Sequence, residues 1–301
     1  MYPVLGARAA QRPVLWPGVP VSDAVGILAV ATAVLAVVFL VGRALLPLLA
    51  RRSAARRSRR GPIPSAWGDI LDRQVPLARS LTPDERERLL RLMQVFLHDK
   101  PFEGCAGLEV TEEMKVTIAG HACLLLLNLD GPCYPGVQSI LVYPEAFLAK
   151  RLLPDTLITL EPLPVPHPLA GESWHGVVVV SWDDTRRSAA DPHDGQNVAL
   201  HEFAHELDKE DGWADGVPLL GSRSAVRTWG RVLAEHFEQL RQQADRGEPN
   251  TLDAYGATNK AEFFAVATET FFENPHQLRA TAPDLYEVLR AYYRQDPATR
   301  A

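Results

Sequence analysis

The stretch that decides the fold runs from Leu200 to Asp208 and reads L-H-E-F-A-H-E-L-D. It carries two histidines, His201 and His205, four positions apart, and Glu202 directly follows the first of them. Residues four apart lie on one face of an α-helix, with their Cβ atoms ~5–6 Å apart. The spacing therefore allows both imidazoles to reach a single metal ion.

Zinc is the metal that this pattern favours, because imidazole and carboxylate groups are among its usual ligands. The ring nitrogens of His201 and His205 would each bind it at ~2.0–2.1 Å. From one step round the helix, Glu202 can take a proton from a zinc-bound water, whose pKa falls to about 7. The alternative is a helix whose histidines pair with Glu206 or Asp208 on a solvated face. The H-E-x-x-H pattern favours one Zn²⁺ per chain and Glu202 as the general base.

A third protein ligand is needed, because a catalytic zinc ion usually has three protein ligands and a water. The helix expected after Asn259 offers Glu262 and Glu269, which are seven positions apart and share a face. Spacing alone does not choose between them, and Glu262 also fits a capping box with Asn259. Glu273 lies farther along this helix and is less suitable.

The other polar residues near the motif include one with two alternative roles and four that we interpret as non-ligands. Asp208 follows His205 by three positions, so it either hydrogen-bonds a ligand histidine or is simply a charge near the end of the helix. Four further histidines have no partner at a useful spacing, and we interpret them as non-ligands: His121, His167, His175 and His193.

Residues 24–42 read AVGILAVATAVLAVVFLVG, nineteen positions without a charge. As a helix this segment would span ~28 Å at ~1.5 Å per residue, close to the hydrocarbon thickness of a bilayer. It is apolar all round, unlike a buried amphipathic helix, and its basic cluster at 51–60 follows it, unlike that of a signal peptide. We therefore predict a transmembrane helix, with the chain after it on the cytoplasmic side.

The chain then divides into four parts: a short extracytoplasmic N-terminus (1–23), the transmembrane helix (24–42), a basic juxtamembrane linker (43–66) and a folded domain (67–301). This arrangement is that of a single-pass protein of the inner (cytoplasmic) membrane, with the lipid bilayer as a partner through residues 24–42.

Composition narrows the partners of the folded domain. Residues 61–301 hold 22 basic and 36 acidic residues, a formal charge of −14, which repels phosphate backbones. We expect no nucleic-acid partner. The three cysteines include no C-x-x-C pair, which favours a reducing compartment over a disulfide framework.

Periodicity and capping signals predict an α+β domain, mostly helical, with a small mixed sheet. Thr82-Pro83-Asp84-Glu85 marks the start of a helix that runs to about Lys100. Five more helices are expected: one after Thr111 that includes HACLLLLNL, and others near 198–209, 225–246, after Asn259 and 284–295. The strands are expected at 137–143 and 176–182, with a weaker one near 156–160 and a turn at Asp183 and Asp184.

Two longer stretches, DGQNVALHEFAHELD from Asp194 to Asp208 and YGATNKAEFFA from Tyr255 to Ala265, resemble the Mlc titration factor A family of bacterial zinc peptidases. The resemblance extends over about 63–297, and the second stretch is also similar to the catalytic domain of anthrax lethal factor. It implies a zincin-like peptidase domain, in which Glu262 is the third zinc ligand and Glu269 supports the site from outside.

The resemblance also implies that Tyr255 lies near the metal and donates a hydrogen bond to the oxyanion, although a loop tyrosine that only packs its ring is an alternative. It implies that the strand at 176–182 takes up substrate at its edge, where an all-valine core strand is the alternative. This chain differs from the family that it resembles in one respect: members of that family begin near residue 61 of this sequence, without the apolar span.

Two functions follow from these patterns. The first is a membrane-anchored zinc metallopeptidase that hydrolyses a peptide or protein substrate, with aminopeptidase-like action on short peptides implied by the family. The second is a regulatory protein that binds and sequesters a transcriptional repressor, as the family name implies, with peptidase activity secondary.

Overall fold

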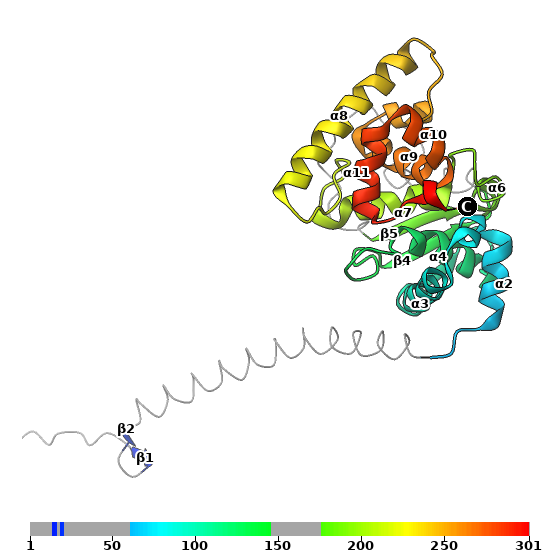
Figure 1. Cartoon of the computed structure of the whole chain (residues 1–301). Helices are drawn as coiled ribbons and strands as arrows, with labels where there is room; N and C mark the ends of the chain where they lie inside the picture. Colours follow the sequence, from blue (N-terminus) through cyan, green and yellow to red (C-terminus); the bar gives the residue numbers. More distant parts are fainter. Residues whose placement is uncertain (1–13, 17–18, 21–60, 146–175, 301) are drawn as a thin grey trace, which may run out of the picture. The chain divides into compact units, whose positions relative to one another are not determined.

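The chain forms two separate units, Met1–Arg56 and Arg57–Ala301. The computed structural model describes residues 14–16, 19–20, 61–145 and 176–300, and these are the residues discussed below (Figure 1). In the first unit, the short strands β1 (Val14–Trp16) and β2 (Val19–Pro20) pair in antiparallel fashion.

Several predictions fall outside the described residues: the N-terminus as a whole, the transmembrane helix at 24–42, most of the linker at 43–66 and the strand near 156–160. Among the helices that are described, none is both long and apolar enough to cross a bilayer. The first described helix of the second unit, α2 (Ser65–Gln74), begins two residues before the expected start of the folded domain at residue 67.

The predicted helix after Thr82 is confirmed as α3 (Pro83–Asp99), which follows a short 3₁₀ turn, η1 (Pro76–Ser80). The Thr82 hydroxyl accepts from the Glu85 N–H at 3.3 Å, and a Glu85 carboxylate oxygen accepts from the Thr82 N–H at 3.0 Å. This reciprocal capping box satisfies two of the N–H groups that the first turn leaves unpaired.

The second predicted helix is α4 (Glu112–Leu125), capped by Thr111. It is buried on every side from Val116 to Leu125, as its continuous apolar run indicates. The apolar run extends beyond the end of the helix, because Leu126 to Asn128 form a turn.

A three-stranded sheet lies beside α4, with strand order β3 (Phe102–Gly104), β4 (Ser139–Tyr143) and β5 (Val177–Ser181). The two predicted strands are confirmed, whereas β3 is a strand that the sequence patterns did not predict. All three described strands are parallel, where a mixed sheet was expected. Along β5, Val178 and Val180 are buried and Val177 and Val179 are half-buried, and the described part of the sheet pairs β5 with β4 alone.

The segment after β5 differs from the prediction of a turn at Asp183 and Asp184. It forms the helix α6 (Trp182–Ser188), whose first turn holds both aspartates. The Ser181 hydroxyl caps this helix by accepting from the Asp184 N–H at 3.2 Å. Acidic residues favour a helix N-terminus as much as a turn, so the same two residues fit both structures.

The remaining helices are α7 (Val198–Asp208), α8 (Arg223–Asp245), α9 (Lys260–Glu273), α10 (Pro275–Thr281) and α11 (Pro283–Tyr293), with 3₁₀ turns at Lys209–Asp211, Ala254–Ala257 (η4) and Pro297–Thr299. The predicted helices near 198–209, 225–246, after Asn259 and at 284–295 are confirmed within a few residues, and α10 was not predicted.

The metal-motif helix α7 lies at the centre of the second unit (Figure 1). It contacts α4 and β5 on one side and α9 on the other. Helix α9 is buried at every position from Glu262 to Glu273, and α8, α10 and α11 pack around it. Three glutamates are therefore carried into the interior on a helix that packs directly against α7.

Gly216 lies in the loop after α7 and contacts both the end of α7 and the start of α9. Its N–H donates to Asp208 Oδ2 at 3.0 Å, and its carbonyl accepts from Trp229 Nε1 at 2.8 Å. Its φ is +78°, and a Cβ atom there would lie 2.4 Å from the carbonyl oxygen of Lys260. Only glycine meets both conditions without strain, so this loop can pack directly on the first residue of α9.

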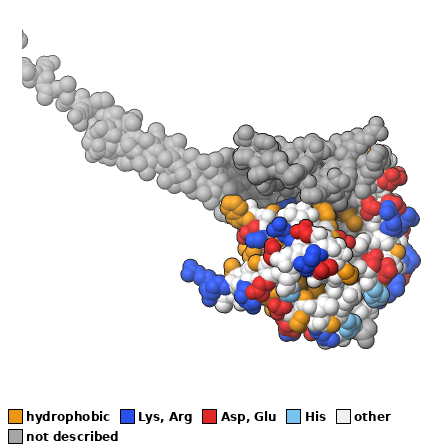
Figure 2. Space-filling model, turned by 90° about the horizontal axis from the view of Figure 1, so that it is seen from above, with side chains coloured by type: hydrophobic (Ala, Val, Ile, Leu, Met, Phe, Trp, Pro, Cys, Tyr) orange, Lys and Arg blue, Asp and Glu red, His pale blue; other side chains and the backbone are white. Residues whose placement is uncertain are grey.

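The described surface in Figure 2 has acidic and basic side chains interspersed, with apolar side chains between them. Large apolar residues with high exposure are few in the described part of the chain: Trp213, Leu219 and Val226.

Candidate metal centre

Helix α7 begins at Asn197, whose side-chain oxygen accepts from the Leu200 N–H at 3.0 Å. The helix turns His201 and His205 toward α9, and both imidazoles are buried, with 8% and 2% of their surfaces exposed. Two unpaired imidazoles inside a protein are costly, so this burial calls for a partner. The solvated-face alternative for the two histidines is wrong.

Glu262 supplies that partner from the first turn of α9. Its Oε2 atom lies 3.0 Å from His201 Nε2 and 3.2 Å from His205 Nε2, and the two Nε2 atoms are 3.2 Å apart. Ligand atoms of a tetrahedral zinc ion, bound at ~2.0–2.1 Å, lie ~3.3–3.4 Å from one another. The triangle of donor atoms therefore has the size that a small divalent ion requires, and these three residues form a group that can hold one.

Capping and metal ligation do not compete at the start of α9. The Asn259 side chain caps the helix by accepting from the Glu262 backbone N–H at 3.0 Å. The Glu262 carboxylate is left to face the histidines. The capping signal at Asn259 is confirmed, and it leaves the Glu262 carboxylate in a group that could hold a metal ion.

The charges in this group are strongly coupled. Burial opposes ionisation of Glu262, but hydrogen bonds with His201 and His205 lower the pKa of its carboxyl to about 2. Burial likewise disfavours a charged His201, but Glu262 and Glu269 raise the pKa of that imidazole well above its ordinary value. Without a cation the site attracts a proton, which a metal ion would replace.

Glu269 lies on the other side of His201. Its Oε1 atom is 2.7 Å from His201 Nδ1, and its Oε2 atom accepts from the Asn197 backbone N–H. Because the Glu269 carboxylate faces Nδ1 of His201, Nδ1 is the nitrogen that donates to it, and Nε2 is the nitrogen that would bind a metal ion in place of a proton. A carboxylate in this position orients a metal-binding histidine and raises its basicity. Glu269 thus lies outside the triangle of donor atoms. The spacing of the two glutamates alone did not decide whether Glu262 or Glu269 would be in it.

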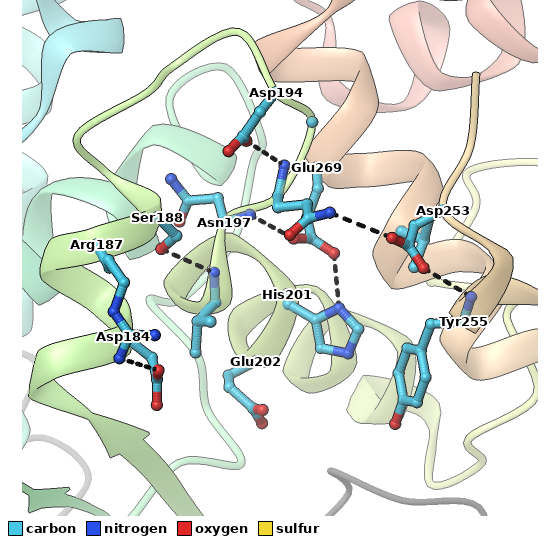
Figure 3. Close-up of a pocket in the computed structure, with 14 residues that line it drawn as sticks. Asp184, Arg187, Ser188, Asp194, Asn197, His201, Glu202, Asp253, Tyr255 and Glu269 are labelled. Carbon is cyan, nitrogen blue, oxygen red and sulfur yellow. Dashed lines mark hydrogen bonds and ion pairs between the residues drawn. The ribbon is translucent and has the colours of Figure 1, made fainter. Parts of the chain in front are cut away.

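Glu202 points into a cavity of about 450 Å³ that also exposes one side of His201 (Figure 3). The cavity is further lined by Asp184 and Arg187 of α6, by the loop before α7 and by Asp253 and Tyr255. Burial raises the pKa of the Glu202 carboxyl to about 7. A carboxyl with this pKa can both accept and return a proton near neutral pH.

Tyr255 lies in η4, beside the same cavity. The Asp253 side chain caps η4 by accepting from the Tyr255 N–H at 2.8 Å. The Tyr255 ring centroid is 5.9 Å from that of His201, with the planes tilted by 42°. Both residues line the cavity, so the ring is placed next to the histidine (Figure 3).

Asp208 does not bond a ligand histidine, so that alternative is wrong. Its Oδ2 atom accepts from Gly216, and within the described residues its Oδ1 atom has no hydrogen-bond partner. Burial raises the pKa of this carboxyl to about 6. Of the four histidines interpreted as non-ligands, His121 is buried in α4 and His193 precedes α7, and neither belongs to the metal-site group; His167 and His175 lie outside the described residues.

Sequence reasoning missed one residue that supports the site, Asn197. Asn197 is both the cap of α7 and a donor to Glu269, and its amide nitrogen donates to Glu273 at 2.8 Å. A cap at Asn197 could be expected from its place just before the motif helix. Its contacts with two glutamates of another helix could not, because they depend on the packing of α7 on α9.

A helix with the H-E-x-x-H pattern, a buried carboxylate converging on it from a second helix and a glutamate facing the adjoining cavity define the class of metallopeptidases. Residues 49–294 match the family described as glucose-regulated metallo-peptidase M90. The chain belongs to this family.

Relatives agree with this assignment. An uncharacterised protein of Synechocystis is 41% identical over 239 residues, which cover 78% of this chain and 86% of the relative. The proteins named Mlc titration factor A of Serratia proteamaculans and Escherichia fergusonii are each 33% identical over 238 residues, which cover 78% of this chain and 88% and 87% of the relatives. The family resemblance seen in the two motif stretches is confirmed.

Replacing Glu262 tests the three-residue group. With Zn²⁺ as the probe, we expect the purified chain to retain about one ion after dialysis, because preformed buried ligands bind tightly. Glu262→Ala should weaken retention by more than the ~10–100-fold that loss of an outer hydrogen-bond partner costs. Elemental analysis and chelator competition measure both quantities.

The matched control is Glu238→Ala, which removes an exposed carboxylate from α8 and should leave retention unchanged. If Glu262→Ala held zinc as tightly as the parent, Glu262 would not be a ligand.

Proposed function

We propose that the chain is a zinc-dependent peptidase that hydrolyses peptide bonds, with His201, His205 and Glu262 as the metal ligands. The observation that carries the proposal is the convergence of one atom from each of these residues, at separations of 3.0 to 3.2 Å. Two imidazoles and one carboxylate form a donor set that zinc prefers.

A zinc ion bound there would polarise the substrate carbonyl and acidify a water molecule. Glu202 then acts as general base and general acid. Its carboxylate lies in the cavity next to His201 and does not belong to the group of three donor residues, so it remains available for proton transfer. With a pKa near 7, it can take the proton of the attacking water and deliver it to the leaving amine.

Tyr255 is proposed to stabilise the transition state. Its ring lies beside His201 at the wall of the cavity, and a phenol hydroxyl there can donate to the oxygen that becomes negatively charged. Donors held in place for a developing charge contribute more than donors that must first reorient.

Short peptides with a free amino terminus are the proposed substrates. The cavity is of about 450 Å³, enough for a few residues, and acidic side chains at Asp184, Asp194 and Asp253 line it against one arginine, Arg187. Arg187 is itself paired with Asp183 and Asp184, so the lining favours a cationic group such as an α-ammonium.

Glu202→Gln separates catalysis from metal binding. We expect it to keep zinc and to lower kcat/KM by ~10²–10⁴-fold, because the amide cannot accept the proton. The assay is hydrolysis of an aminoacyl nitroanilide and of its N-acetylated form, of which only the first should be cleaved by the parent chain. The control is Glu206→Gln, the same change one helical turn further on, and this variant should hydrolyse the nitroanilide as fast as the parent chain. Full activity in Glu202→Gln would rule out the assigned base.

Tyr255→Phe tests the hydroxyl. Because it removes one donor to the transition state and keeps the ring, we expect kcat to fall by ~10²–10³-fold with KM and zinc content nearly unchanged. Steady-state kinetics on the same nitroanilide measures this. An unchanged kcat would leave Tyr255 with only a packing role beside His201.

We also propose that the peptidase unit faces the cytoplasm and is held at the inner membrane by residues 24–42. The support is the charge-free apolar run at 24–42 and the arginines that follow it at 51–60. The full chain should sediment with membranes and resist alkaline carbonate, and deletion of 24–42 should release it. Replacing the arginines of 51–60 by glutamine should leave it in the membrane. Release of the full chain by carbonate would contradict an integral span.

A regulatory function is the alternative, because two of the relatives carry the name Mlc titration factor A. In this case the chain sequesters a transcriptional repressor and its peptidase activity is secondary. Glu202→Gln decides between the two functions. A variant that keeps zinc and the regulatory phenotype while losing hydrolysis would make binding the main function.

A further inference from the structure

Glu273, the last residue of α9, is a buried acid that the reaction described above does not use. It is 1% exposed, and it lies one helical turn beyond Glu269. Its Oε1 atom accepts from the Asn197 side-chain amide at 2.8 Å, while within the described residues its Oε2 atom has no hydrogen-bond partner. A buried acid with one oxygen left without a partner among the described residues is costly to the fold and calls for a reason.

Asn197 uses each of its polar groups. The side-chain oxygen accepts from the Leu200 N–H at 3.0 Å, and the side-chain nitrogen donates to Glu273. The backbone carbonyl accepts from the His201 N–H at 2.9 Å, and the backbone N–H donates to Glu269. A turn of the amide would lose both side-chain bonds at once, so Glu273 holds Asn197 in one orientation.

These contacts form a continuous series from the end of α9 to a metal ligand. Glu273 accepts from the Asn197 side chain, and the Asn197 backbone N–H donates to one oxygen of Glu269. The other oxygen of Glu269 lies 2.7 Å from His201 Nδ1 (Figure 3). We propose that Glu273 is a positioning residue of the metal centre, which acts through Asn197 and Glu269 on the orientation of His201. The inference rests on the proposed zinc site.

The ionisation state of Glu273 agrees with this role. Burial raises the pKa of its carboxyl to about 9, with Glu269 and Asp194 adding to the increase. At neutral pH it is an uncharged acid, which can stay buried without a cation beside it. An amide has the same shape and the same acceptor oxygen, so glutamine should replace Glu273 without loss.

Zinc affinity, measured on the full chain by chelator competition, tests the proposal. Glu273→Leu leaves the buried Asn197 amide without an acceptor, and we expect zinc to bind about threefold to tenfold more weakly, less than the ~10–100-fold for a direct outer partner. Glu273→Gln should bind zinc like the parent. Equal affinity in Glu273→Leu and the parent would overturn the proposal, as would a loss in Glu273→Gln equal to that in Glu273→Leu.

A stability control comes from the neighbouring position. Phe272 is buried on α9 and packs on Tyr293, with ring centroids 5.1 Å apart. Phe272→Leu should lower the Tm of the metal-free chain but leave zinc affinity unchanged, which separates positioning from general loosening of α9. If Phe272→Leu weakened zinc binding as much as Glu273→Leu does, the effect of Glu273 would come from the general stability of α9, and the proposal would fail.

Asn197→Ser gives a second route if Glu273→Leu does not fold. Serine keeps the cap on α7 but lacks the amide that reaches Glu273. We expect the same loss of affinity as in Glu273→Leu, and no further loss in the double variant, because both changes break one hydrogen bond. Additive losses would overturn the proposal.

Failure of the proposed zinc site would give a different result. In that case the parent chain itself would not retain zinc and would not differ from Glu262→Ala. A parent that binds zinc, together with an unaffected Glu273→Leu and an unaffected Asn197→Ser, would reject only the positioning role.

Discussion

The rest of the structure depends on the enforced contact of three electron-rich atoms, His201 Nε2, His205 Nε2 and Glu262 Oε2, inside the protein. Their lone pairs repel one another and are shielded from water, so only a proton or a metal ion makes the arrangement favourable. The fold must therefore hold α7 and α9 together firmly enough to keep these atoms 3.0 to 3.2 Å apart. The contact lowers the stability of the metal-free fold, and binding of a cation to the folded state raises that stability again.

Several local features meet that demand. Asn197 and Asn259 cap the two helices at the ends where the ligands begin, so the first turns do not fray. Gly216 brings a loop from the end of α7 onto the first residue of α9. Buried packing of α9 on all sides then prevents the helix from rotating. Together these features fix the relative placement of the two helices, and the two caps also bond the backbone N–H groups of His201 and Glu262 directly.

Much of this could be predicted from local sequence. The capping box at Thr82, the apolar run of α4 and the H-E-x-x-H spacing of α7 depend only on neighbouring residues, and these elements appear where expected. The choice between Glu262 and Glu269 could not be made by spacing, because both lie on one face of α9 and the outcome depends on how far α9 is shifted along α7. The short strand β3 and the contacts of Asn197 with Glu269 and Glu273 depend on tertiary packing in the same way.

The three glutamates of α9, at positions 262, 269 and 273, are separated by seven and four residues and therefore share one side of the helix. Insertion or deletion of one residue between Glu262 and Glu269 would turn the later carboxylates by about 100° relative to the first, since a helix has ~3.6 residues per turn. The number of residues between Glu262 and Glu269 is therefore fixed by the geometry of the site, which does not constrain the length of a surface loop in this way.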